Sequence, residues 1–213
     1  MKNLIDITIF LLLQYLFTTI ILIILYQGGS YFHPDTTYFV MYQNYLSDLG
    51  RSYYFNGEEN LFWSLYSGTL ILLSLGTALF FYILSQIISK KSYLPLLFGV
   101  IASLGFIGVS FYLEDENFFL HTFFARLAYV SYLLGTLTTM IYWKKRLCPD
   151  VYLWLMILNF FLFGYLIIVF LAPPSIENEF FLIIRTVSQK IIVVIQILIT
   201  SFVLFKIRKH IKP

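Results

Sequence analysis

The residues of this chain that could do chemistry gather in one polar stretch, Asn44-Tyr45-Leu46-Ser47-Asp48-Leu49-Gly50-Arg51. Within it, a hydroxyl (Ser47), a carboxylate (Asp48) and a guanidinium (Arg51) lie close together in sequence. A carboxylate and a guanidinium make strong, charge-assisted hydrogen bonds to ionic groups. A carboxylate can also orient or exchange a proton in acid–base catalysis. The stretch therefore suits either the binding of a polar headgroup or acid–base chemistry.

Four basic residues lie inside otherwise apolar segments of the chain: His121, Arg126, Arg185 and Lys190. Charges in a membrane span are costly and usually face the interior of a helix bundle or a water-filled cavity. At a rise of about 1.5 Å per residue, His121 and Arg185 lie within about two turns of the outer end of their segments. Arg126 and Lys190 lie deeper. Arg126 lies off the small and polar face of its helix that carries His121, and Lys190 is expected to snorkel or to find a partner of its own.

Asp48 and Arg51 of the polar stretch are predicted to meet His121 and Arg185 at the outer mouth of the bundle, because the carboxylates of the outer turns lie on the same side. Two interpretations remain open. In the first, buried pairs between arginine and carboxylate only fix how the outer loop docks. In the second, the cluster is a binding or catalytic site, since perturbed ionisable groups concentrate at functional sites. The predicted ligand-binding residues are Asp48, Arg51, Glu114, His121, Arg185 and Gln189, with Asp115 as an alternative to Glu114.

If the chain is an enzyme, His121 would act as general base, oriented by Asp48 or Glu114. The other histidines, His33 and His210, are not spaced to form a zinc site with it. The sequence also has no Gly-x-Ser-x-Gly elbow and no glycine-rich phosphate loop. We therefore expect no metal, no cofactor and no nucleic-acid partner.

The composition places this chemistry in a membrane protein. The 213 residues are 60% hydrophobic and 12% charged, with a mean hydropathy of +0.83. Soluble domains are about one quarter charged. Apolar runs of about 20 residues mark membrane helices, because lipid offers no hydrogen bonds to an open backbone. The runs are too long for the alternating segments of about ten residues found in membrane barrels.

The chain is therefore predicted to be an all-α polytopic membrane protein with a single transmembrane domain, residues 1–213. Asn159 lies in the middle of the fifth predicted helix and should form a hydrogen bond across helices. Glycines in the second and third helices are predicted to allow close helix packing: Gly68, Gly76, Gly99, Gly105 and Gly108. The predicted transmembrane helices cover residues 5–26, 61–89, 93–113, 118–143, 151–172 and 180–205.

The long outer loop, residues 27–60, is predicted to contain an amphipathic helix over Thr36–Leu49. At about 100° per residue, aromatic and aliphatic side chains cover one face of this helix. The polar side chains of Asn44, Ser47 and Asp48 gather on the opposite face. Such a helix would lie in the membrane interface, with its apolar face in lipid or against the bundle.

The distribution of charge predicts the orientation. Nine of the eleven carboxylates fall on the side of the long loop, and ten of the fourteen lysines and arginines fall on the other side. Basic loops remain in the cytoplasm, so both termini are predicted to be cytoplasmic, in the inner or plasma membrane of the cell. The ten basic residues are Lys2, Lys90, Lys91, Lys144, Lys145, Arg146, Lys206, Arg208, Lys209 and Lys212.

Several of these features together resemble a known family. The residues that carry the resemblance are the Ser-Asp-Leu-Gly motif at 47–50, Gly68, the acidic turn Glu114-Asp115, His121, Ala125 and Arg185. The pattern resembles the prokaryotic six-helix membrane family catalogued as domain of unknown function nine-nine-eight. That family is distantly similar to the Frag/DRAM/Sfk group of eukaryotic membrane proteins, which is linked to lipid remodelling, lipid distribution and autophagy. The resemblance implies six helices and a functional outer face that includes Asp48, His121 and Arg185.

Three functions are compatible with the sequence. The first is binding of a lipid headgroup or another amphiphile, in which Arg185, Arg51 and His121 attract an anionic group and Asp48 orients them. The second is a small subunit of a larger membrane complex, in which the aromatic face of 38–49 contacts a partner protein. The third is an enzyme that acts on a lipid of the outer leaflet through His121 and a carboxylate.

Overall fold

The computed structural model of the chain describes residues 1–88, 93–143, 149–171 and 178–211. Within these ranges it contains six long α-helices, each apolar enough to cross a membrane. The prediction of an all-α, six-helix membrane protein is therefore confirmed. The elements are α1 (Lys2–Leu25), the short 3-10 helix η1 (Leu46–Gly50), α2 (Trp63–Ile88), α3 (Leu94–Phe111), α4 (Phe118–Tyr142), α5 (Pro149–Leu171) and α6 (Glu179–His210).

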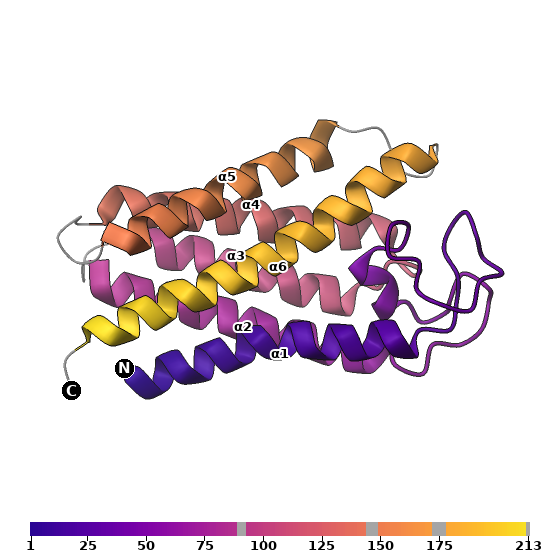
Figure 1. The fold of residues 1–213 in the computed structure, drawn as a ribbon, viewed down its shortest axis with the longest axis horizontal. Coiled ribbons are helices and arrows are strands. Elements are labelled where there is room, and N and C mark those ends of the chain that lie inside the picture. The colour runs from indigo at the N-terminus through magenta and orange to yellow at the C-terminus, as the bar shows by residue number, and fades with distance from the viewer. Residues whose placement is uncertain (89–92, 144–148, 172–177, 212–213) are drawn as a thin grey trace.

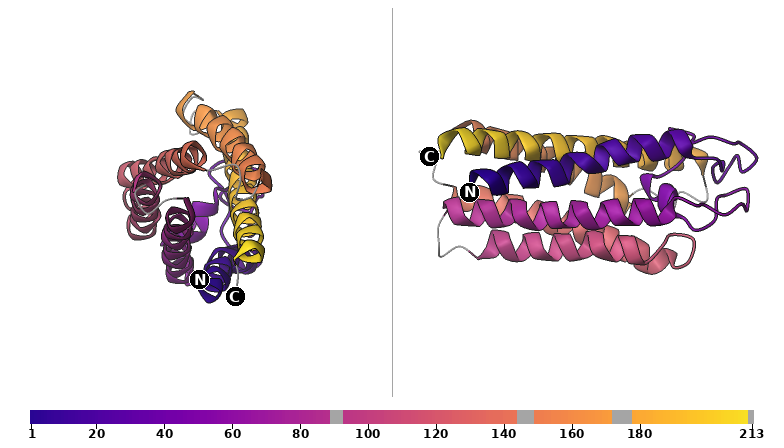
Figure 2. Two further views of the ribbon diagram at one scale, coloured as in Figure 1. Left: turned by 90° about the vertical axis from the view of Figure 1, so that its left-hand side faces the viewer. Right: turned by 90° about the horizontal axis from the view of Figure 1, so that it is seen from below.

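The helices run lengthwise (Figure 1) and are arranged in a ring in chain order. Each helix packs against the next, and α6 returns to pack against α1, as the view along the bundle shows (Figure 2). Both termini lie at one end of the bundle, which we call the terminal end; residues 26–62 and the turn between α3 and α4 lie at the opposite, loop end.

Which end faces the cytoplasm stays a prediction. Six of the basic residues on which it depends lie outside the described residues: Lys90, Lys91, Lys144, Lys145, Arg146 and Lys212. Two of the described residues among the ten, Lys206 and Arg208 of α6, lie at the terminal end and pair there with carboxylates of α5 and α1. Lys206 Nζ lies 3.1 Å from Asp150 Oδ2, and Arg208 Nε lies 2.7 Å from Asp6 Oδ1.

Two asparagines begin helices at the loop end. The Asn117 side chain accepts a hydrogen bond from Leu120 N at 3.1 Å at the start of α4. The Asn178 side chain accepts one from Phe180 N at 2.8 Å at the start of α6. Each bond satisfies a backbone N–H that has no partner within the helix. The two caps fix where the helices carrying His121 and Arg185 begin.

Polar pairs join helices inside the ring. Thr136 Oγ1 of α4 donates to Asn159 Oδ1 of α5 at 2.7 Å, which confirms the predicted hydrogen bond of Asn159 across helices. Tyr132 of α4 and Thr200 of α6 share a hydrogen bond of 2.7 Å between their hydroxyls, and both are buried. In lipid such bonds specify which helix faces pack together, because an unpaired polar group is costly there.

Four of the five predicted glycine positions do allow close packing. A Cβ at Gly105 would lie 2.7 Å from Ala128 N, so the backbones of α3 and α4 are in contact there. At Gly99 and Gly108 a Cβ would overlap the side chains of Phe81 and Phe124, and at Gly76 it would press on Leu11 and Leu12. Gly68 is the exception, because a Cβ there would meet nothing within 4 Å.

The predicted amphipathic helix over Thr36–Leu49 is wrong. This part of the chain is irregular up to Tyr45, and only η1 is helical. The reason is that polar side chains bind the backbone N–H groups that a helix would use: Asn44 Oδ1 accepts from Val40 N at 2.8 Å, and Asp48 Oδ2 accepts from Tyr45 N at 2.9 Å. The expected aromatic face is also divided, with Tyr38 exposed and Phe39 buried.

Gly105→Ala should destabilise the protein by about 1–3 kcal/mol, the usual cost of overpacking, because the added methyl group would push α3 away from α4. Gly68→Ala is the matched control: with open space around it, the methyl group should leave stability unchanged or raise it by up to about 1 kcal/mol. Thermal unfolding of the purified variants in one mild detergent measures both. Equal stability of the two variants would contradict the packing described for Gly105.

Candidate functional site

The long loop folds into the mouth of the bundle with its polar side chains inward. Residues 42–53, which we call the roof segment, contain several buried polar residues. Asn44 is 0% exposed and Asp48 1%, and Gln43 and Ser47 are also buried. Buried polar groups are tolerated only when they are hydrogen-bonded. The partners of these side chains therefore define how the roof segment is held.

Asn44 forms hydrogen bonds with backbone groups around it. Its Oδ1 accepts from Val40 N, and its Nδ2 donates to Gly29 O at 2.9 Å and to Asp48 Oδ2 at 3.0 Å. Its own carbonyl oxygen accepts a hydrogen bond from Lys190 Nζ of α6. One asparagine thus joins the start of the loop, η1 and α6.

Asp48 lies behind the roof, buried against Asn44. Its Oδ2 accepts from Asn44 Nδ2 and from Tyr45 N, whereas its Oδ1 has no hydrogen-bond partner among the described residues. Burial raises the pKa of this carboxyl well above its ordinary value, and the nearby charge of Glu114 raises it further. Asp48 therefore shapes the roof from a position that does not line the cavity described below.

Three side chains of α6 hold the roof segment from one side. Thr186 Oγ1 donates to Tyr42 O at 2.6 Å, Gln189 Oε1 accepts from Leu46 N at 2.8 Å, and Lys190 binds Asn44 O. Lys190 also lies over the ring of Phe39, with Nζ 5.5 Å from its centre. The expectation that Lys190 finds a partner of its own is thus met by the loop backbone.

The acidic turn between α3 and α4 holds the roof segment from the other side. Ser47 Oγ donates to Glu114 Oε2 at 2.8 Å. Ser52 Oγ and Tyr53 N donate to Asp115 Oδ2 at 2.8 and 3.0 Å. Both carboxylates bind neutral donors, and neither forms an ion pair with another described residue.

Beneath the roof segment is a cavity of about 240 Å³, which we call the loop-end cavity. Its walls come from the loop-end parts of α4, α5 and α6, and its upper edge comes from the roof segment and the acidic turn. Polar and apolar side chains both contribute. The lining residues are Tyr45, Ser47, Glu114, Phe118, His121, Thr122, Ala125, Arg126, Tyr129, Tyr165, Leu166, Val169, Arg185 and Gln189.

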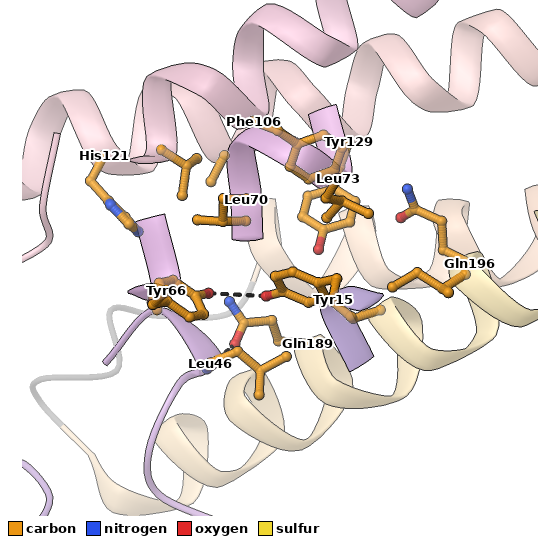
Figure 3. A pocket seen from close by; sticks show the side chains of 15 residues that line it. Tyr15, Leu46, Tyr66, Leu70, Leu73, Phe106, His121, Tyr129, Gln189 and Gln196 are labelled. Carbon is orange, nitrogen blue, oxygen red and sulfur yellow. Dashed lines mark hydrogen bonds between the residues drawn. The ribbon is translucent and has the colours of Figure 1, made fainter. Parts of the chain in front are cut away.

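A smaller void of about 40 Å³ continues toward the centre of the bundle (Figure 3). It shares Ser47, His121, Tyr129 and other lining residues with the loop-end cavity. In Figure 3 the hydroxyls of Tyr15 and Tyr66 point toward one another, and they are 3.0 Å apart. A void of this size with hydroxyl and amide groups in its wall has room for about one water molecule.

His121 lines both spaces, and its ring is oriented by a backbone carbonyl. The contact is between Nδ1 and Tyr112 O, at 2.7 Å. Since a carbonyl only accepts, Nδ1 carries the proton, and Nε2 is the basic nitrogen of the neutral ring. Among the described residues no carboxylate forms an ion pair with His121, so neither Asp48 nor Glu114 orients it.

The structure brings together four of the six predicted ligand-binding residues. Glu114, His121, Arg185 and Gln189 line the loop-end cavity. Asp48 lies behind its roof. Arg51 points away from it: its guanidinium carbon lies 4.1 Å from the centre of the Phe55 ring, and Nε donates to Tyr53 O at 3.2 Å.

Sequence reasoning missed one cationic residue of the cavity, Arg126. Its position off the helix face that carries His121 argued against a shared site. However, the cavity is wide enough to reach both faces of α4, and Arg126 lines it from the side of α5. Its guanidinium carbon lies 5.3 Å from the centre of the Phe170 ring. Its place inside an apolar span indicated that Arg126 needs a polar environment, but its helix face did not indicate this cavity.

Comparisons with family models, curated proteins and solved structures give no match to this chain. The resemblance to the family catalogued as domain of unknown function nine-nine-eight therefore stays a prediction. Within the described ranges, no three His, Cys, Asp or Glu side chains are grouped closely enough to hold a metal ion.

Replacing Asp48 by asparagine should stabilise the protein at neutral and alkaline pH. The folded-state pKa of Asp48 is raised, so the folded protein binds this proton more tightly than the unfolded chain does. The free energy of unfolding then falls as the pH rises from the ordinary aspartate pKa, about 3.9, toward the raised value. Asp48→Asn keeps the acceptor for Tyr45 N and removes the buried charge. It should be at least about 1 kcal/mol more stable than the wild type near about pH 8, and this gain should shrink toward about pH 5.

Thermal unfolding of the detergent-purified protein across this pH range measures the effect. Asp35→Asn is the matched control, because Asp35 is exposed in the same loop and should show no pH-dependent difference. An Asp48→Asn variant that is less stable than the wild type at alkaline pH would show that the charged carboxylate is needed.

Proposed function

We propose that this integral membrane protein binds the anionic headgroup of a membrane amphiphile in the loop-end cavity. The observation that carries the proposal is that Arg126 and Arg185 line one cavity together with apolar side chains such as Leu166 and Val169. The wall of this cavity has cations in one part and apolar groups in another. It therefore suits an amphiphile, which has an anionic part and an apolar part.

The charges favour an anion near the arginines. Glu114 is the one carboxylate among the residues that line the cavity, and it lies at the roof, where Ser47 donates to it. Arg126 and Arg185 come from the deeper walls of α4 and α6. A guanidinium presents several N–H donors in a plane, which matches the oxygens of a phosphate. His121 and Gln189 supply further polar contacts close by.

The size of the cavity favours a headgroup over a complete ligand. Pockets that enclose drug-sized molecules are usually about 300–1,000 Å³, whereas the loop-end cavity is about 240 Å³. A phosphate with a small polar substituent fits this space, but acyl chains do not. If the termini are cytoplasmic, as the distribution of charge predicts, this headgroup belongs to the outer leaflet.

Catalysis is a second candidate, and the orientation of His121 favours it. The bond to Tyr112 O leaves Nε2 as the basic nitrogen of a histidine that lines the cavity. A subunit role has weaker support, because the aromatic surface that would contact a partner is divided between exposed and buried side chains. Release of a radiolabelled headgroup from phosphatidylglycerol by the wild type, and its loss in His121→Ala, would favour the enzyme over the binding protein.

Arg185→Gln should weaken the binding of phosphatidylglycerol by at least about tenfold, the loss expected for one charge-assisted hydrogen bond. Arg51→Gln is the matched control, since Arg51 lies in the loop with its guanidinium over Phe55; its affinity should stay within about twofold of the wild type. Native mass spectrometry of the protein in detergent, titrated with phosphatidylglycerol or phosphatidylcholine, measures both. Wild-type affinity in Arg185→Gln, or equal binding of the two lipids, would contradict the proposal.

A further inference from the structure

We infer that the loop-end cavity opens sideways to the bilayer between α4 and α5, and that its ligand is an anionic phospholipid whose phosphate binds Arg126 at this opening. The inference rests on the proposed function and extends it: it names the class of ligand and the route by which the ligand enters.

Arg126 lies well inside the membrane-spanning helix α4. It lies eight residues after Phe118, the first residue of α4, which at about 1.5 Å per residue is about 12 Å inside the helix. It lines the cavity and is itself exposed. An exposed side chain in the wall of a cavity indicates an opening of the cavity at that point. Because α4 is a membrane span, this opening faces lipid.

The charge of Arg126 lies beside an aromatic ring. Arg126 stacks over Phe170, and within the described part of the chain it forms no hydrogen bond and no ion pair. An arginine at this depth without a polar partner is costly in lipid. A lipid phosphate supplies both the negative charge and the acceptor oxygens that a guanidinium binds. The site is therefore incomplete without an anion.

Both helices that border the opening carry exposed phenylalanines. Phe118 and Phe170 are 55% and 53% exposed, and further exposed phenylalanines on the two helices include Phe119, Phe123 and Phe163. This surface suits acyl chains, whereas the cavity behind it is partly polar. Figure 1 shows α5 inclined to α4 along the bundle, as expected if the two helices separate on one side of the cavity.

These features also orient the lipid. Glu114 and Ser47 lie at the roof, at the loop end, and the two arginines lie deeper. A phosphate near Arg126 and Arg185 then places a headgroup hydroxyl or ammonium toward Glu114, which can accept its hydrogen bond. The acyl chains leave between α4 and α5 and continue toward the bilayer centre, as they do in the surrounding leaflet.

The test is photolabelling in detergent by phosphatidylglycerol that carries a diazirine in one acyl chain, with the labelled residues identified by mass spectrometry. In the wild type the label should fall on residues that border the opening, in 118–126 and 166–170. Arg126→Gln and Val169→Trp should each reduce this labelling by at least about tenfold, the first by removing the charge and the second by filling the opening. Ile167→Trp is the control, since Ile167 is exposed on α5 and does not line the cavity, and its labelling should match the wild type.

Competition separates the sources of the anionic group. Excess unlabelled phosphatidylglycerol should abolish the labelling, and inorganic phosphate or phosphatidylcholine should not. Labelling that falls on other helices, that survives in both Arg126→Gln and Val169→Trp, or that inorganic phosphate abolishes would overturn the inference. If phosphatidylglycerol binding still depends on Arg185 in such a case, the proposed headgroup site stands and only the lateral opening fails. If binding does not depend on Arg185, the proposed function fails first.

Discussion

The site depends on the burial of polar backbone at the mouth of an apolar helix bundle. A loop that enters such a mouth must exchange its hydrogen bonds to water for bonds within the protein, or its N–H and C=O groups become costly. Asn44 meets much of this requirement, because its side chain and its carbonyl bind Val40, Gly29, Asp48 and Lys190. Once these bonds form, the roof segment has one favoured position relative to α6.

The cavity follows from that position. The roof segment is held between α6 and the acidic turn by bonds from both sides, so it covers the mouth without filling the space beneath it. The walls of that space carry arginines from α4 and α6, which a solid apolar core would exclude. The same fold therefore explains why the carboxylates lie at the roof and the arginines lie below it. The two carboxylates have different structural roles: Asp48 holds the conformation of the loop, and Glu114 lines the cavity.

The sequence was sufficient to predict the helices, because each requires only a long apolar run. It also predicted that Glu114, His121, Arg185 and Gln189 belong together, since intramembrane charges and outer-loop carboxylates had to meet on one side. It failed for Thr36–Leu49, where a helical period competed with side chains that bind the backbone, and tertiary contacts decided the outcome. The roles of Asp48 and Arg51 could not be predicted for the same reason: although they lie three residues apart in one motif, Asp48 is buried against Asn44 and the Arg51 guanidinium lies over Phe55.

The most direct test of the account is amide hydrogen exchange of the loop in lipid nanodiscs. The amides of Asn44, Tyr45 and Leu46 donate to acceptors within the protein, so they should exchange at least about 100-fold more slowly than an unprotected backbone, which corresponds to a local opening free energy of about 3 kcal/mol. The amide of Asn56, an exposed residue of the same loop, donates to no acceptor among the described residues, so it should exchange much faster. Rapid exchange throughout 42–50 would mean that the loop lies outside the bundle, and it would contradict the roof on which the cavity depends.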